Sequence, residues 1–119
     1  MRYTLEQTLA WLNQAVAERG ADFNYRQAYY HASDACFYVE DNGDGTSEPG
    51  CIAGYVFALA GIPPAELRAE EGASAYSAAG RLGFALPARW ALDRAQKVQD
   101  AGGTWGEALV AAHEKGCHE

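Results

Sequence analysis

Residues 51–60, read as CIAGYVFALA, contain no charged side chain and are apolar at nearly every position. Pro49 and Gly50 precede this run, and Gly61 with the pair Pro63–Pro64 ends it. A helix that is apolar on nearly every side has to be buried by other elements, because no face of it suits water. The run therefore predicts a buried helix over residues 51–60 and constrains the rest of the chain to pack around it.

The N-terminal segment TLEQTLAWLNQAVAERG, residues 4–20, predicts an amphipathic helix. Thr4 and Gln7 have the spacing of a capping box, and Gly20 is a typical C-terminal stop. Apolar side chains recur every three or four residues, which is the spacing of one helix face. This stripe consists of Leu5, Leu9, Leu12 and Val16.

Further helices are predicted after the central run, and β structure before it. Thr104 and Glu107 form a second capping-box pattern that begins a helix ending near Gly116. Pro63–Pro64 begin a short helix, and residues 72–83 and 86–103 carry helical patterns. Residues 35–39, ACFYV, are typical of a strand, part of residues 21–35 is expected to pair as a strand, and residues 40–50 are expected to form a loop.

The predicted fold class is α+β and mainly α-helical. With 119 residues and an ordinary hydrophobic content of 49%, the chain suits one compact domain over residues 1–119. We expect about five helices with a small β-hairpin or short sheet. Residues 116–119 are expected to form a loose tail, because chain ends are usually poorly tied down.

The charge distribution argues against nucleic acid and membranes as partners. The formal net charge is −7 and arises within residues 1–72, because residues 73–119 carry as many bases as acids. The basic side chains Arg81, Arg89, Arg94 and Lys97 are interrupted by Asp93 and are interpreted as a solvated helix face, not a phosphate-binding stripe. Acidity disfavours anionic membranes, and no window of the sequence is apolar enough for a membrane span.

The cysteines favour a reducing compartment. Cys36, Cys51 and Cys117 are odd in number, and the N-terminus has no apolar segment typical of a secretory signal. Free thiols in a cytosol explain both observations better than a disulfide framework does.

Two metal sites are weighed and not favoured, and no cofactor is expected. Glu40, Asn42, Asp44 and Glu48 match part of a calcium-binding loop, but Cys51 stands where the final carboxylate ligand is needed. An acidic, glycine-rich turn explains the same residues. A zinc site lacks the usual paired spacing among its candidate ligands, which are Cys36, Cys51, Cys117, His31, His113 and His118.

Cys51 leaves two alternatives open. A helix N-terminus lowers a thiol pKa, and GCIAGYVFALAGIPP resembles the nucleophile helix of papain-like cell-wall hydrolases. That resemblance implies Cys51 as nucleophile. His31 is the candidate histidine partner in this hypothesis, but it precedes the cysteine and would require a permuted arrangement of the family's site. The chain departs from the family because its residues after 72 are predicted to be helical, without the later strand that carries the family's histidine. The other alternative is a buried, structural cysteine.

A second resemblance covers roughly residues 35–110. The pattern CFYV, then PGCIAGYVFALAGIP, then AQKVQDAGGTWGEAL is similar to a group of small uncharacterised proteins encoded by bacteriophages of actinobacteria. The matching positions are Cys36, Pro49, Cys51, Gly54, Gln96, Gln99, Asp100, Gly103, Trp105 and Ala108. This resemblance implies a phage origin and brings no activity, so it assigns no catalytic residue.

These observations predict a small accessory protein in the cytoplasm of an infected host cell. It is expected to act without catalysis, by binding a host or phage protein, and a homodimer stays an open alternative. A thiol hydrolase that uses Cys51 and His31 is the second hypothesis. The third is an acidic decoy that mimics nucleic acid, supported only by the charge of residues 1–72.

Overall fold

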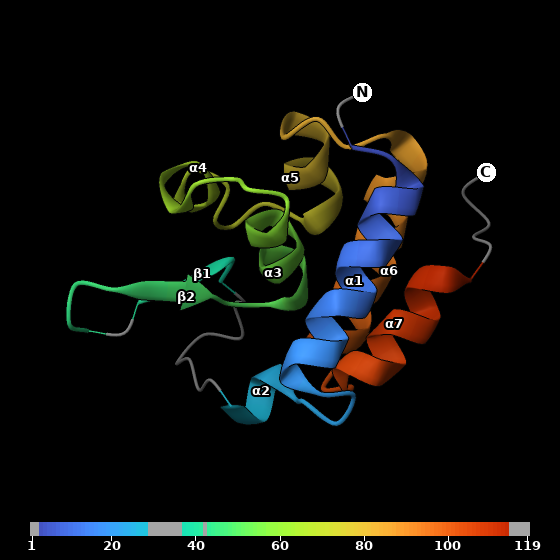
Figure 1. The fold of residues 1–119 in the computed structure, drawn as a ribbon, viewed down its shortest axis with the longest axis horizontal. Helices are drawn as coiled ribbons and strands as arrows, with labels where there is room; N and C mark the ends of the chain where they lie inside the picture. The colour runs from blue at the N-terminus through green and yellow to red at the C-terminus, as the bar shows by residue number, and fades with distance from the viewer. Residues whose placement is uncertain (1–2, 29–36, 42, 115–119) are drawn as a thin grey trace.

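The computed structural model describes residues 3–28, 37–41 and 43–114 (Figure 1). Within these ranges the chain forms seven helices and one antiparallel pair of strands, so the mainly helical α+β class is confirmed. The structure has seven helices in the described residues where about five were expected, partly because some of these helices are very short. The elements are α1 (Leu5–Arg19), α2 (Tyr25–Ala28), β1 (Val39–Asp41), β2 (Ser47–Pro49), α3 (Ile52–Leu59), α4 (Pro64–Arg68), α5 (Ala75–Arg81), α6 (Leu86–Asp100) and α7 (Trp105–His113).

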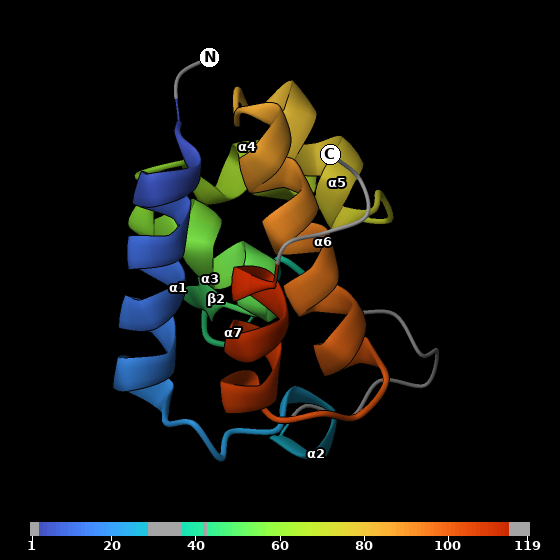
Figure 2. The same cartoon turned by 90° about the vertical axis from the view of Figure 1, so that its right-hand side faces the viewer.

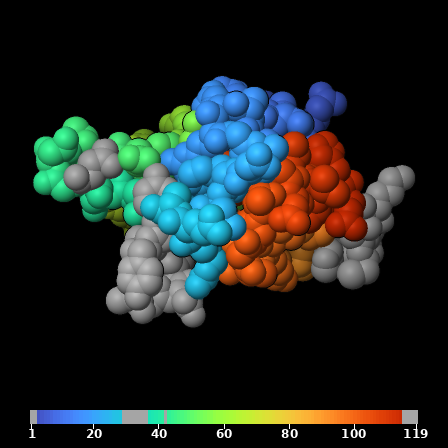
Figure 3. All heavy atoms as spheres, turned by 90° about the horizontal axis from the view of Figure 1, so that it is seen from below, coloured from blue at the N-terminus to red at the C-terminus, as the bar shows by residue number. Residues whose placement is uncertain are grey.

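The long helices form the frame of the molecule. α1, α6 and α7 pack against one another, and α3 packs against α1 and α6 (Figures 1 and 2). α7 lies on one side of α1, while α3, α4 and the β-hairpin lie on the other. The hairpin projects at one end of the molecule (Figure 3).

The central helix is buried as its composition predicts. In α3, the side chains of Ile52, Val56 and Phe57 have no exposed surface. Gly54 faces the backbone of Tyr38 so closely that an added Cβ would lie 2.3 Å from the Tyr38 carbonyl oxygen. The chain just before β1 therefore crosses α3 at a position where only glycine fits.

The first helix buries a face that is rotated slightly from the predicted stripe. Leu12 and Val16 are buried, whereas Leu5 and Leu9 are half-buried against the core. Thr8 and Ala15 complete the buried face, and the Thr8 hydroxyl donates to the Thr4 carbonyl at 2.8 Å. Small and polar residues can thus occupy core positions that a count of large apolar residues misses.

The helix ends follow the predicted signals. Both capping boxes are present, at Thr4 with Gln7 and at Thr104 with Glu107. Gly20 ends α1 with a φ of 102°, in the left-handed region that favours glycine. The predicted stop at Gly116 lies outside the described residues.

The β structure differs from its prediction in position. The strand expected over 35–39 begins only at Val39 and continues into the segment expected to be a loop, where β2 pairs with it. Val39 pairs with Pro49 and Asp41 with Ser47. The reversal is tight because Gly43 and Gly45 both adopt positive φ, so the acidic turn closes a hairpin and is not a long loop.

The segment 21–35 also differs from its prediction. Tyr25–Ala28 forms the helix α2, where pairing as a strand was expected, and residues 29–36 lie outside the described residues. Asn24 accounts for the helical start, because its side-chain oxygen accepts from the Gln27 N–H at 3.1 Å. In the part of the chain that the structure describes, no helix is both long and apolar enough to cross a membrane.

Candidate functional site

Cys51 is the N-cap residue of α3 and has no exposed surface. Its backbone N–H donates to the Phe37 carbonyl at 2.9 Å, and its side chain makes no capping hydrogen bond. The sequence therefore placed Cys51 correctly at the start of a helix. Its burial closes the thiol off from any substrate in solution.

Two glutamines from α6 supply the cap that Cys51 does not. The Gln99 Oε1 accepts from the Ile52 N–H at 2.8 Å, and the Gln96 Oε1 accepts from the Ala53 N–H at 3.1 Å. These are donors in the first turn of α3, which have no partner within the helix. The positive end of the α3 dipole thus meets the side-chain oxygens of two neutral amides from another helix.

Asp100 and Trp105 hold the two glutamines in place. One oxygen of Asp100 accepts from both amide groups, at 2.9 Å each, and the Trp105 indole N–H donates to Gln99 Oε1 at 3.2 Å. Gln99 and Trp105 have no exposed surface. Four residues of the pattern QxxQDxxxxW therefore form one network that joins α6 and α7 to the start of α3, with both glutamines and Trp105 buried and Asp100 at the exposed edge.

Arg19 fixes the chain just before α3. Its guanidinium donates to the carbonyl of Gly50 at 2.7 Å and of Pro49 at 2.5 Å, and it pairs with Glu48 at 3.3 Å. The same group lies 4.8–5.1 Å from the centroids of three aromatic rings, those of Phe23, Tyr55 and Trp105. Charge-assisted hydrogen bonds and cation–π contacts together make this a structural anchor.

A tyrosine and two carboxylates secure the other end of the hairpin. The Tyr25 hydroxyl donates to Glu40 and accepts from the Phe37 N–H at 3.1 Å. Burial, as the main cause, and the hydrogen bond to Glu40, as the second, raise the pKa of Tyr25 well above its usual value. Glu71 accepts from the N–H groups of Tyr38 at 2.9 Å and Val39 at 3.2 Å. Burial raises the pKa of Glu71, although both hydrogen bonds act in the opposite direction.

The calcium-loop residues are not brought together around one point. Glu40 faces Tyr25, Glu48 faces Arg19, and Asp44 accepts from Thr46 at the exposed turn. Asn42 lies outside the described residues. Among the residues that are described, no group of three or more histidine, cysteine, aspartate or glutamate side chains is placed to hold a metal ion.

The histidine required by the thiol hypothesis, His31, lies outside the described residues, as do Cys36, Cys117 and His118. His113 is exposed at the end of α7, whose first residue, Trp105, contacts the network beside Cys51. At 1.5 Å per residue this separates the two ends of α7 by roughly 12 Å. His113 is therefore at the wrong end of its helix to serve Cys51.

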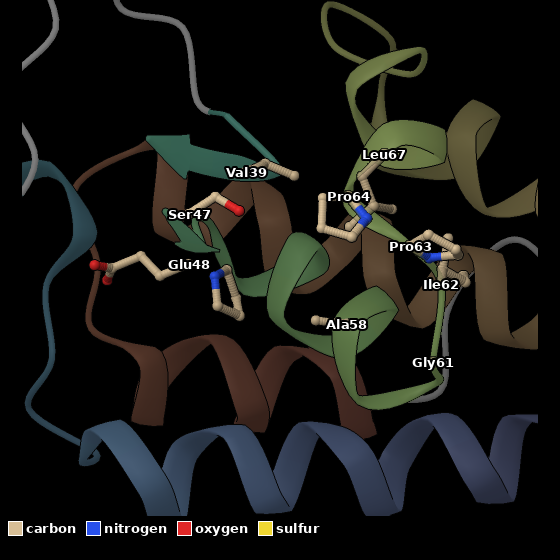
Figure 4. A pocket seen from close by; sticks show the side chains of 10 residues that line it. Val39, Ser47, Glu48, Ala58, Gly61, Ile62, Pro63, Pro64 and Leu67 are labelled. Carbon is tan, nitrogen blue, oxygen red and sulfur yellow. The ribbon is translucent and has the colours of Figure 1, made fainter. Parts of the chain in front are cut away.

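A pocket of about 310 Å³ lies between the hairpin, the end of α3 and the start of α4 (Figure 4). Its walls are mostly apolar, and the Glu48 carboxylate points away from them, toward α1. The lining residues are Val39, Ser47, Glu48, Pro49, Ala58, Gly61, Ile62, Pro63, Pro64 and Leu67.

The local sequence builds this pocket from turns. Gly61 follows α3 with a φ of 88°, which turns the chain away from the helix, and Pro63 caps the short helix α4. Ile62 and Leu67 are buried, whereas Pro63 and Pro64 are exposed. Sequence reasoning treated GIPP as a helix stop and missed the pocket. The available signal was the pair of prolines with aliphatic residues on both sides of it, in IPPAEL.

No protein family, no curated protein and no solved structure matched the chain in comparisons with each.

Proposed function

We propose that this chain is a non-catalytic protein-binding module, which binds a host or phage protein through the pocket beside the hairpin. The observation that carries the proposal is the apolar pocket itself, open at the surface between β2 and α4. The phage setting and the cytoplasm of the infected cell are part of the proposal and rest on the sequence resemblance.

The state of the polar groups supports binding over catalysis. Cys51, Gln96 and Gln99 are buried in contacts that stabilise the start of α3. Among the described side chains, no buried nitrogen or oxygen lacks a hydrogen-bond partner. The side-chain oxygens of Gln96 and Gln99 are thus engaged by the first N–H groups of α3, which is a structural role.

The size of the pocket favours a small apolar anchor. Ligand sites usually measure about 300–1,000 Å³, so a volume of about 310 Å³ lies at the lower end of that range. Such a space suits one or two apolar side chains of a partner. Anchors of this kind often contribute most of the binding free energy of a protein interface.

The test is a pair of matched substitutions in a capture experiment. Ala58→Leu places a larger side chain in the pocket, and Ala17→Leu makes the same change on the exposed face of α1. A partner captured from host lysate by the wild type and by Ala17→Leu, but not by Ala58→Leu, would support the proposal. Capture that is equal for both variants would refute the pocket as the binding site.

A further inference from the structure

We propose that the segment bound in this pocket is positively charged and inserts one apolar side chain between the hairpin and α4. This inference rests on the proposed function and specifies the chemistry of the partner. It draws on three features of the site: the walls of the pocket, the charge around it and the state of the strand edges.

The walls of the pocket favour an aliphatic or aromatic side chain. Val39, Ala58, Ile62 and Leu67 provide apolar surface, and prolines stand on both sides. Proline has a fixed φ, so these walls change little in shape when a ligand binds. The single charged lining residue, Glu48, directs its carboxylate to Arg19.

The surroundings of the pocket are acidic. Residues 37–50 contain four acidic side chains and no basic one. The described cations facing this segment are Arg19, which is largely buried against Glu48, and Arg68, which pairs with Asp41 at 2.8 Å. Asp44 remains at the exposed turn, where hydrogen bonds from Thr46 lower its pKa and keep it charged, and Glu66 is exposed on α4. Asp44 and Glu66 do not line the pocket, but they belong to the hairpin and to α4, two of the elements that form it, and their negative charge attracts a cationic segment.

The edges of the hairpin argue against a partner that binds by adding a strand. Strand addition depends on backbone N–H and C=O groups that are available at a sheet edge. Pro49 has no N–H, and its carbonyl accepts from Arg19. The N–H groups of Tyr38 and Val39 donate to Glu71. At these positions the backbone groups are already engaged, which favours recognition of the bound segment by its side chains.

A second copy of the chain fits this site poorly. In a two-fold interface each copy presents the same surface to the other. The two acidic hairpins would then lie close together, and like charges oppose such an interface. The partner is consequently a different protein, or a differently charged segment of one.

The inference can be tested by nuclear magnetic resonance titration of the labelled protein with short synthetic peptides. The probe is Gly-Ser-Lys-Lys-Leu-Lys-Lys-Ser-Gly, compared with a peptide that has glycine in place of leucine and one that has glutamate in place of every lysine. We expect the leucine peptide to shift the amide signals of Ala58, Gly61 and Leu67. It should bind about tenfold or more tightly than the glycine peptide, as expected from burying one leucine. The glutamate peptide should not bind.

Variants separate the two parts of the inference. Ala58→Leu should remove the preference for leucine, whereas Ala17→Leu should keep it. Asp44→Asn combined with Glu66→Gln should weaken the leucine and glycine peptides by the same factor, because it removes charge and leaves the walls intact. If Ala58→Leu does not fold, the positions of the shifted amide signals in the wild type decide whether the peptide binds in the pocket.

Each contrary outcome overturns the inference. Equal binding of the leucine and glycine peptides would indicate an acidic decoy that acts by charge alone. Equal binding of the lysine and glutamate peptides, or shifts away from the pocket, would refute the assigned chemistry. Self-association that Ala58→Leu abolishes would assign the pocket to a second copy. If no peptide binds while a captured partner still requires the pocket, this inference fails and the proposed function stands.

Discussion

At the scale of single residues, Gln99 does the most to organise the buried network. One carboxamide accepts from the Ile52 N–H and the Trp105 indole and donates to Asp100. Gln99→Ala would leave at least two buried donors without an acceptor, and each such group costs about 1–3 kcal/mol. We expect the free energy of unfolding in urea to fall by about 2–4 kcal/mol.

The matched control for Gln99→Ala is Gln14→Ala on α1. The Gln14 amide also makes a side-chain hydrogen bond, to Glu18, but it is exposed. Surface substitutions of this kind usually change stability by no more than about 0.5 kcal/mol. Equal losses in the two variants would contradict the assigned role of Gln99.

Cys51 provides a second test at this scale, because a buried structural thiol and a reactive nucleophile predict opposite rates of chemical labelling. A thiol without exposed surface reacts only when the structure opens. Iodoacetamide should therefore label Cys51 slowly in the native protein and rapidly in urea, measured at each cysteine by mass spectrometry. Fast labelling of native Cys51 at neutral pH would revive the nucleophile hypothesis.

The substitution Cys51→Ser addresses the same thiol through stability. It keeps the size of the side chain and places a hydroxyl in a buried site. We expect a loss of about 1–2 kcal/mol, because that hydroxyl would be imperfectly hydrogen-bonded. Binding through the pocket should persist, because Cys51 is not among the residues that line it.

At the scale of elements, the crossing of α3 with the chain before β1 depends on Gly54. A Cβ at this position would lie 2.3–2.8 Å from three backbone atoms of Tyr38, which cannot move without shifting the hairpin. Replacing a helical glycine with alanine normally gains up to about 1 kcal/mol, but overpacking usually costs more. Gly54→Ala should therefore lower the free energy of unfolding by about 1–3 kcal/mol.

Gly80 in α5 is the control for this crossing. Its added Cβ would also meet close atoms, at 2.6–2.8 Å, but these belong to the flexible end of Arg89. Because that side chain can rotate away, Gly80→Ala should stay within about 1 kcal/mol of the wild type. A Gly54→Ala variant that is as stable as Gly80→Ala would show that the crossing tolerates a side chain.

The elements also show which parts of the fold the sequence could predict. Capping boxes and apolar periodicity are local signals, so α1, α3, α6 and α7 were predicted close to their observed positions. The prediction for α2 was wrong although its cap is local, since Asn24 accepts from the N–H three residues further on. The hairpin boundaries were wrong because strand pairing depends on contacts that no local pattern contains. The pocket was missed for the same reason, since it combines β1, β2, α3 and α4.

At the scale of the whole molecule, acidic side chains have two different roles. Some remain exposed, as do Asp44 at the hairpin turn and Glu66 on α4. Others are turned inward, where Glu71 ties the segment between α4 and α5 to the chain entering β1. The free energy of unfolding should therefore depend on whether the partly buried Glu71 carboxyl group is ionised.

That dependence can be measured through pH. Burial, with a smaller contribution from the negative charge of Glu40, raises the pKa of Glu71 in the folded state. The stability that this group contributes is fully present below the pKa of an unfolded glutamate, about 4.3, and is lost as pH rises through the higher folded pKa. The free energy of unfolding of the wild type should accordingly decrease, relative to Glu71→Gln, as the pH rises through that window.

Glu66→Gln removes the same charge from an exposed position and serves as the control. The offset between wild type and Glu71→Gln is uninformative, because an amide also places a donor beside the Val39 N–H. A difference that is constant with pH, or that changes in the opposite direction, would show that the hairpin anchor does not oppose ionisation of Glu71.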